Sequence, residues 1–157
     1  MRFLFLILLI GISCNSKYDF YETHGVSDLY VIPLYKLYRL STVSDDRKLT
    51  GEAWGLDLKY KSGGFKDNYT NVTDINLTKG VIYGNGKREE GAEPNDWFVI
   101  ITENRTEKIF ENEKDWLNYL SKIGIDSVKL YQTWDLFYKF RDRSILPWYN
   151  PSKGIYP

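Results

Sequence analysis

The sequence predicts an α+β protein, in which an antiparallel β-sheet fills the N-terminal two-thirds and one or two C-terminal helices pack on that sheet. Strand patterns come first: apolar and polar residues alternate over residues 52–60, and residues 97–103 form a strongly apolar run. Helical spacing of apolar residues begins only after residue 112. Because strands precede helices instead of alternating with them, the sheet is expected to be antiparallel.

Residues 29–43, LYVIPLYKLYRLSTV, predict the first strand, since Val, Ile and Tyr are frequent there. Pro33 has no N–H to donate to a neighbouring strand, so this strand is expected to lie at a sheet edge or to be broken at Pro33. Residues 44–47 are polar and predict a turn.

Residues 52–60, EAWGLDLKY, give the clearest strand pattern, with one buried face. The buried phase comprises Trp54, Leu56, Leu58 and Tyr60, and the other phase comprises Gly55, Asp57 and Lys59. The following residues 65–74 are mostly polar and are expected to form a solvated loop.

Residues 75–84, INLTKGVIYG, predict a further strand or a pair of strands, and the polar residues 87–96 predict an exposed loop. Residues 97–103, WFVIITE, are expected to form a central strand, because a continuous apolar run is typical of a strand buried on both faces. A turn at residues 104–105 then leads into a short returning strand over residues 107–110.

Helix signals begin at Asn112, whose side chain can cap a helix, and the acidic Glu113 and Asp115 fall in the first turn. The expected apolar face comprises Trp116, Leu117, Leu120 and Ile123, and Gly124 is the expected stop. A second helix is indicated by residues at positions i, i+3, i+4 and i+7, which are Trp134, Phe137, Tyr138 and Arg141.

Composition bounds the function classes. The chain carries 21 Lys and Arg against 21 Asp and Glu, so no basic excess is present to neutralise a row of phosphates, which argues against nucleic acid as a partner. The only cysteine is Cys14, so the fold must hold without a disulfide. Aromatic residues make up 17% of the chain, which favours β structure and large-area packing.

The N-terminus has the layout of an export signal. Arg2 precedes ten residues, Phe3 to Ile12, that carry no charge, and small Ser13 precedes Cys14. A membrane-spanning helix needs about 20 apolar residues, so this run is too short to span. A plain secretory signal with an incidental cysteine is the alternative.

The residues Gly11-Ile12-Ser13-Cys14 resemble the lipobox of bacterial lipoproteins. The resemblance implies that a signal peptidase cuts between Ser13 and Cys14, and that Cys14 carries a thioether-linked diacylglycerol and further acyl chains such as palmitate. Residues 1–13 would be a cleaved signal peptide and residues 14–27 a lipidated tether, followed by one globular domain over residues 28–157. Asn15, rather than Asp, follows the cysteine, which by resemblance favours the outer membrane or cell surface over the inner membrane.

No catalytic residue and no metal site is predicted. His24 is the only histidine and falls in the expected tether, where nothing would hold it as a general base. Zinc needs several Cys or His ligands, which are lacking, and GVIYGNGK departs from the phosphate-loop pattern at two positions. The best hard-cation candidate is a polar cluster for which a solvated loop is the favoured interpretation, formed by Asp67, Asn68, Asn71 and Asp74.

Trp148, Tyr149 and Tyr156 lie among prolines outside any periodic pattern, and either cover a sheet edge or form a binding surface. The function predicted is therefore that of a membrane-anchored lipoprotein with a non-catalytic binding or interaction role in the cell envelope. Its expected partners are the membrane, through the covalent lipid on Cys14, and an envelope protein or glycan, with no other cofactor. The alternatives are an immunity-type inhibitor of a toxin and a small carboxylate-dependent envelope hydrolase.

Overall fold

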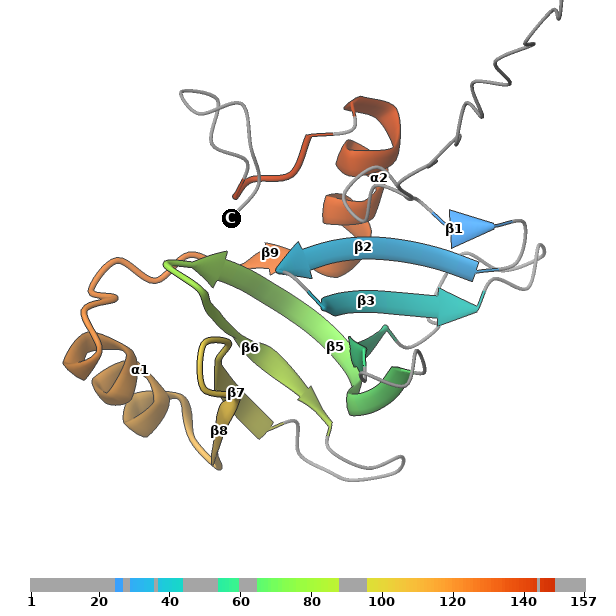
Figure 1. The fold of residues 1–157 in the computed structure, drawn as a ribbon. Coiled ribbons are helices and arrows are strands. Elements are labelled where there is room, and N and C mark those ends of the chain that lie inside the picture. Colours follow the sequence, from blue (N-terminus) through green and yellow to red (C-terminus); the bar gives the residue numbers. More distant parts are fainter. Residues whose placement is uncertain are drawn as a thin grey trace, which may run out of the picture.

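The computed structural model describes residues 25–26, 29–35, 37–43, 54–59, 65–87, 96–143 and 145–148. These residues form an antiparallel sheet system followed by two helices, which confirms the predicted α+β class (Figure 1). The strands are β1 (Gly25–Val26), β2 (Leu29–Tyr35), β3 (Tyr38–Val43), β4 (Gly55–Lys59), β5 (Phe65–Thr78), β6 (Val81–Lys87), β7 (Asp96–Ile101), β8 (Thr106–Phe110) and β9 (Tyr131–Gln132). The helices are α1 (Glu113–Lys122) and α2 (Thr133–Arg143).

Strands β1 to β8 pair with one another in chain order, and every pair is antiparallel. Strand β9 adds to β5 beyond the point where β4 ends, through the pairs Asp74↔Gln132 and Ile75↔Tyr131. Short connections between consecutive strands make such a meander the direct way to pair neighbours.

The single strand predicted over residues 29–43 is wrong, because the segment folds back as the hairpin of β2 and β3. The register shifts between Pro33 and Tyr35, where proline cannot donate to the ladder. Folding back pairs Ile32 with Leu40 and buries both side chains. The interruption expected at Pro33 is therefore present, and it is followed by a complete reversal of the chain.

The loop predicted over residues 65–74 is also wrong, because this segment is the first part of the 14-residue strand β5. Two of its few apolar side chains, Tyr69 and Val72, are almost completely buried. Strand β5 pairs with β4 through Phe65–Tyr69 and with β6 through Thr70–Thr78. Pairing on both sides and burial of these two side chains outweigh a polar composition that otherwise favours a loop.

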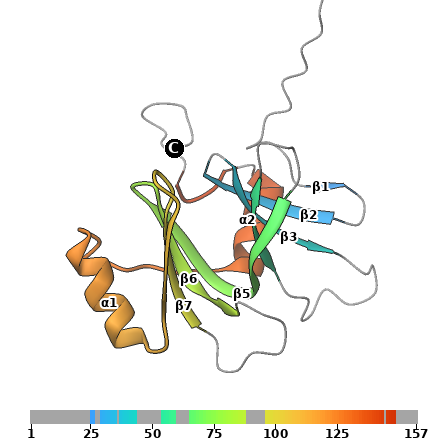
Figure 2. The same ribbon diagram turned by 60° about the horizontal axis from the view of Figure 1, so that its bottom comes forward.

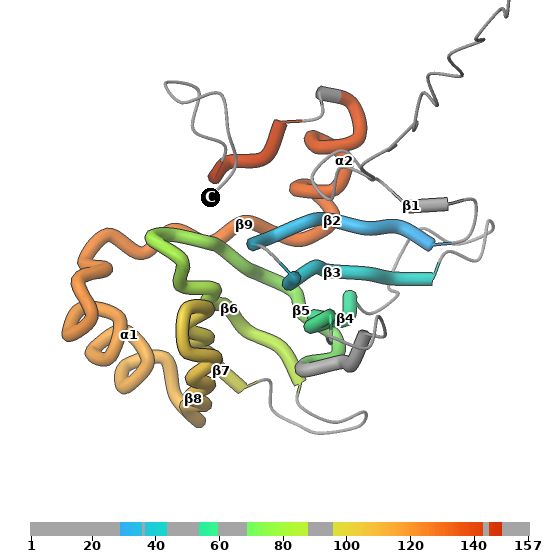
Figure 3. Tube along the Cα trace, viewed as in Figure 1, coloured from blue at the N-terminus to red at the C-terminus, as the bar shows by residue number. Residues whose placement is uncertain are grey.

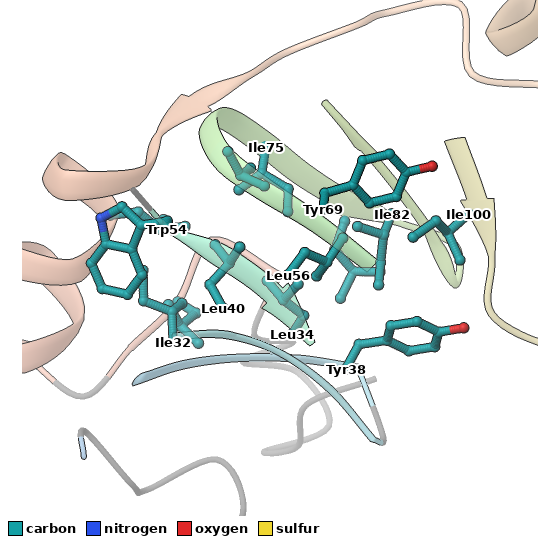
Figure 4. Close-up of a cluster of buried hydrophobic side chains, with 14 of the residues drawn as sticks. Ile32, Leu34, Tyr38, Leu40, Trp54, Leu56, Tyr69, Ile75, Ile82 and Ile100 are labelled. Atoms are coloured by element: carbon teal, nitrogen blue, oxygen red, sulfur yellow. The ribbon is translucent and has the colours of Figure 1, made fainter. Parts of the chain in front are cut away.

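Strand β5 joins two groups of strands, β1–β4 on one side and β6–β9 on the other. The first core lies between these two groups (Figure 4). Tyr69 stacks on Phe98 with 4.3 Å between ring centroids, and this contact joins β5 to β7. The buried members of the first core are Ile32, Leu34, Tyr38, Leu40, Trp54, Leu56, Leu58, Tyr69, Val72, Ile75, Leu77, Ile82, Phe98, Ile100, Leu136, Phe137, Phe140 and Leu146.

The second core lies on the opposite face of β6 and β7, under α1. Figure 2 shows α1 on one side of β5–β7 and the strands β1–β3 on the other side. Alternation along β7 explains this, since Phe98 and Ile100 enter the first core while Val99 enters the second. The buried members of the second core are Val81, Tyr83, Val99, Trp116, Leu120 and Ile125.

Helix α1 begins and ends as predicted. The Asn112 side chain accepts a hydrogen bond from the Asp115 backbone N–H at 2.9 Å, and Gly124 ends the helix with φ +82°. Trp116 donates from Nε1 to the Phe98 carbonyl at 3.1 Å. The predicted apolar face is wrong at Leu117, which is 39% exposed, because Trp116 and Leu120 already fill the contact with the sheet.

Helix α2 closes the first core, and the predicted face is correct except at Arg141. Phe137 is buried, and Trp134 and Tyr138 pack against the core, whereas Arg141 is exposed. The Phe137 ring stacks on Tyr30 of β2 with 4.7 Å between centroids. The buried stripe also includes Leu136 and Phe140, which the spacing did not identify.

Gly84 of β6 is expected to tolerate no side chain. A Cβ at this position would overlap the carbonyl oxygen of Asp74 and lie 3.1 Å from the Cα of Ile75. Gly84→Ala should therefore lower the free energy of unfolding by about 3 kcal/mol, measured by chemical denaturation. Gly55→Ala is the matched control, since its Cβ would find its nearest neighbour at 3.4 Å, and a change of more than about 1 kcal/mol there would contradict the argument.

Candidate functional site

Most of the predicted anchor and surface residues, namely Ser13, Cys14, Tyr149 and Tyr156, lie outside the described residues, as does His24, for which no catalytic role is predicted. Their roles therefore stay predictions. Within the part of the chain that the structure describes, no helix is long and apolar enough to cross a bilayer.

Trp148 of the predicted aromatic surface is described, and its ring is half-buried against the first core. Its indole Nε1 is buried and has no hydrogen-bond partner among the described residues. Trp148 therefore contacts the first core, and the predicted roles of the aromatic tail, as cover for a sheet edge or as a binding surface, both stay predictions.

The polar cluster considered for a hard cation lies on strand β5, where Asp67 and Asn68 also belong. The Asp74 carboxylate accepts hydrogen bonds from Thr73 Oγ1 at 3.1 Å and from Asn85 Nδ2 at 3.2 Å. Thr73 lies on β5 itself and Asn85 on β6, so the carboxylate is used within the sheet. No group of three acidic, histidine or cysteine residues in the described ranges could hold a metal ion.

Asp57 is a buried carboxylate that the sequence pattern did not predict. The alternation of residues along β4 had placed its side chain on the face opposite the buried one, where exposure to solvent was expected. Its side chain points away from the first core as expected, yet the residue is only 2% exposed. Its Oδ2 accepts from Arg39 Nε at 3.0 Å and from Ser41 Oγ, both on the adjacent strand β3. A buried charge needs such partners, so this arrangement is that of an ion pair joining two strands.

Two tyrosine hydroxyls lie at one end of the first core. Figure 4 shows the rings of Tyr38 and Tyr69 pointing their hydroxyls toward the same end. The Tyr38 hydroxyl is buried and has no hydrogen-bond partner among the described residues. Burial raises the pKa of Tyr38, and the negative charge of Glu107 raises this pKa further, against a lowering by Arg105.

A pocket of about 490 Å³ opens between α2, β9 and residues 145–147. Its apolar lining comes from residues 130–131, from α2 and from residues 145–147, and its polar lining comes from residues 129–132 and from α2. The lining residues are Lys129, Leu130, Tyr131, Gln132, Asp135, Leu136, Lys139, Ile145, Leu146 and Pro147. Figure 3 shows the chain crossing from α1 to β9 before it enters α2. Tyr131 and Gln132 of β9 line the pocket and pair with Ile75 and Asp74 of β5, so this wall lies beside β5.

Hydrogen bonds to β5 fix that wall. Asn76 Nδ2 donates to the Lys129 carbonyl at 2.7 Å, and Thr133 Oγ1 donates to the Val72 carbonyl at 3.1 Å. In each bond a side chain donates to a backbone carbonyl, and each bond joins the segment around β9 to β5. The pocket therefore has one wall fixed to the sheet before any ligand binds.

The charged groups of the pocket are two lysines and one carboxylate. Lys129 Nζ lies 4.7 Å from the centroid of the Tyr131 ring, which attracts the ammonium group. No ion pair joins Lys129, Lys139 or Asp135 to any described residue. The backbone N–H of Asp135 donates to Gln132 Oε1 at 2.9 Å, so Gln132 caps α2 and keeps its amide NH2 group as a donor.

The sequence pattern identified none of these pocket residues. Lys139 and Asp135 are four residues apart on a helix, which by itself indicates a solvated face. The pocket exists only because residues 145–147 return to α2, and this return leaves no signal in local periodicity. The clearest hint in the sequence was Pro147, because proline interrupts regular structure and Pro147 lines the pocket.

Comparison with known proteins adds no family to these observations: no family model matches the chain, and neither curated proteins nor solved structures give a significant match. The function must therefore be argued from the anchor motif and from the geometry of the pocket.

Tyr38→Phe tests the buried hydroxyl. The folded state raises the pKa of the Tyr38 hydroxyl. The stability linked to its neutral form is therefore fully present below the unfolded pKa of 10.0 and is lost as the pH rises through the folded pKa. The wild type should therefore lose stability relative to Tyr38→Phe as the pH rises above about 10. Near pH 7 the variant should be as stable as the wild type or up to about 1 kcal/mol more stable, because it removes an unsatisfied hydroxyl. Urea denaturation across this pH range measures both, and a constant difference would contradict the argument.

Proposed function

We propose that this protein is a membrane-anchored bacterial lipoprotein with a non-catalytic binding role in the cell envelope, and that the pocket beside α2 is its binding site. The observation that carries the proposal is the pocket itself. Its volume of about 490 Å³ falls in the range of small-molecule sites, and it combines an apolar lining with a few polar groups that can orient a ligand.

The anchoring part of the proposal is supported by the lipobox-type residues that end at Cys14, the only cysteine of the chain. One acyl chain holds a protein at a membrane only marginally, whereas two or three chains make attachment effectively stable. Asn15 after the cysteine supports an outer-membrane or surface address. The partner would then be a component of the envelope.

A binding role is preferred to hydrolysis because of what the described carboxylates do. Asp57 is engaged by Arg39 and Ser41 in the sheet, and the pocket is lined by a single carboxylate, Asp135. Acid–base hydrolysis by carboxylates usually needs a pair that flanks the bond to be cleaved. The described lining also includes no serine, cysteine or histidine that could act as a nucleophile or base.

Replacement of Cys14 tests the anchor. In cells fed labelled palmitate, the wild type should carry label and fractionate with membranes, whereas Cys14→Ser should carry no label and should accumulate as a larger, unprocessed or soluble form. Ser16→Ala is the control, since it leaves the acceptor sulfur in place and should keep the label. Label on Cys14→Ser would refute the lipoprotein assignment.

A charge placed at the pocket mouth tests the binding site. Ile145 is 57% exposed and lines the pocket, so Ile145→Glu should fold normally and should reduce retention of an envelope component at least about tenfold in pull-downs from an envelope extract. Leu117→Glu is the matched control, because Leu117 is 39% exposed on α1 and is not part of the pocket lining. Equal retention by both variants would exclude the pocket as the binding site.

A further inference from the structure

The charges at the pocket do not neutralise one another. Lys129 comes from the segment before β9 and Lys139 from the second turn of α2, so two walls of the pocket each contribute an ammonium group. Neither ammonium group makes an ion pair with a described residue. With the single carboxylate of Asp135, the lining carries a net charge of +1.

Asp135 competes only weakly with a bound anion for the two lysines, because it lies in the first turn of α2. The positive end of the helix dipole favours a negative charge at that position. Asp135 and Lys139 are also four residues apart on one helix face, and yet they form no ion pair. The lysine charges therefore stay available to a ligand.

Lys129 is held close to the pocket wall by an aromatic ring. Its Nζ lies 4.7 Å from the centroid of Tyr131, which also lines the pocket. This contact limits the directions in which a long, flexible side chain can move, and it keeps the charge beside the apolar lining. Low-dielectric walls next to a cation strengthen its attraction for an anion.

The apolar part of the lining determines the rest of the ligand. Leu136 and Leu146 are buried members of the first core, whereas Leu130, Ile145 and Pro147 complete the pocket surface. This lining would favour an aliphatic or aromatic body over a fully polar one, since burial of apolar area is favourable.

We infer, building on the proposed binding function, that the pocket takes a small amphipathic monoanion. The ligand is a carboxylate attached to an apolar body, with the carboxylate between Lys129 and Lys139 and the apolar body on Leu136, Ile145 and Leu146. A monoanion matches the net charge of +1 in the lining, whereas a neutral or cationic analogue of the same shape leaves the lysines without a counterion.

Three ligands of equal shape test this inference. The full-length lipidated protein in phosphatidylcholine nanodiscs is titrated with 4-phenylbutanoate, 4-phenylbutanol and 4-phenylbutylammonium, with empty nanodiscs as the blank. The carboxylate should bind about tenfold more tightly than the alcohol, and the ammonium compound should bind least. Equal affinity for the carboxylate and the alcohol, or no binding of any of the three, would overturn the inference.

Lysine variants identify the groups responsible. Lys129→Gln and Lys139→Gln should each weaken binding of 4-phenylbutanoate by roughly fivefold and leave the affinity for 4-phenylbutanol unchanged. Lys114→Gln and Lys122→Gln on α1 are the matched controls and should behave like the wild type. Pocket variants that bind the carboxylate as the controls do would overturn the inference.

The same titrations separate this inference from the proposed function. If Ile145→Glu abolishes binding of 4-phenylbutanol while the lysine variants leave 4-phenylbutanoate unaffected, the pocket is a binding site and the anionic ligand class is wrong. If Ile145→Glu leaves envelope retention unchanged in the pull-down, the proposed function fails whatever the small molecules do.

Discussion

The pairing of strand β5 on both of its edges is the constraint on which the rest of the structure depends. Its first part pairs with β4 and its second part with β6 and β9, so one 14-residue strand belongs to both groups of strands. Both groups then contribute to the first core, and α1 can cover the far face of β6 and β7. Asn71, at φ +49°, lies where the pairing with β6 shifts register, and such a bulge bends a strand. A strand that failed to bend there would leave the two halves of the core unable to meet.

The same strand explains which parts of the fold could be predicted from the sequence. Local signals predicted the strand at Gly55–Lys59, the apolar strand at Asp96–Ile101 and the capped helix after Asn112, because each of these depends on neighbours in the sequence. The polar start of β5 could not be predicted, since its strand state comes from pairing with β4 and β6 and from the burial of Tyr69. The split of β2 from β3 was hidden for a related reason, because Pro33 indicates an interruption but not the direction that the chain takes afterwards.

The candidate site was less predictable than the fold. Alternation along β4 placed Asp57 on the correct face, yet it could not show that Arg39 and Ser41 on the neighbouring strand would engage the carboxylate. The pocket is a still more distant consequence of the fold, since Lys129 and Lys139 lie ten residues apart in the sequence and share a pocket only when residues 145–147 return to α2. The proposed anchor motif is the opposite case, because the resemblance of residues 11–14 to a lipobox is read from the linear sequence and depends on no fold.

The chemistry that holds the described fold together also bears on the proposed binding site. The single cysteine lies at position 14, so the described domain depends on burial and hydrogen bonds rather than on disulfides. The pocket shares this basis: Leu136 and Leu146 belong to the first core, and Asn76 and Thr133 hold the pocket wall to β5. A ligand that binds the folded state there stabilises the same contacts that hold α2 on the sheet. Occupancy of the pocket and stability of the C-terminal part of the fold are therefore thermodynamically linked.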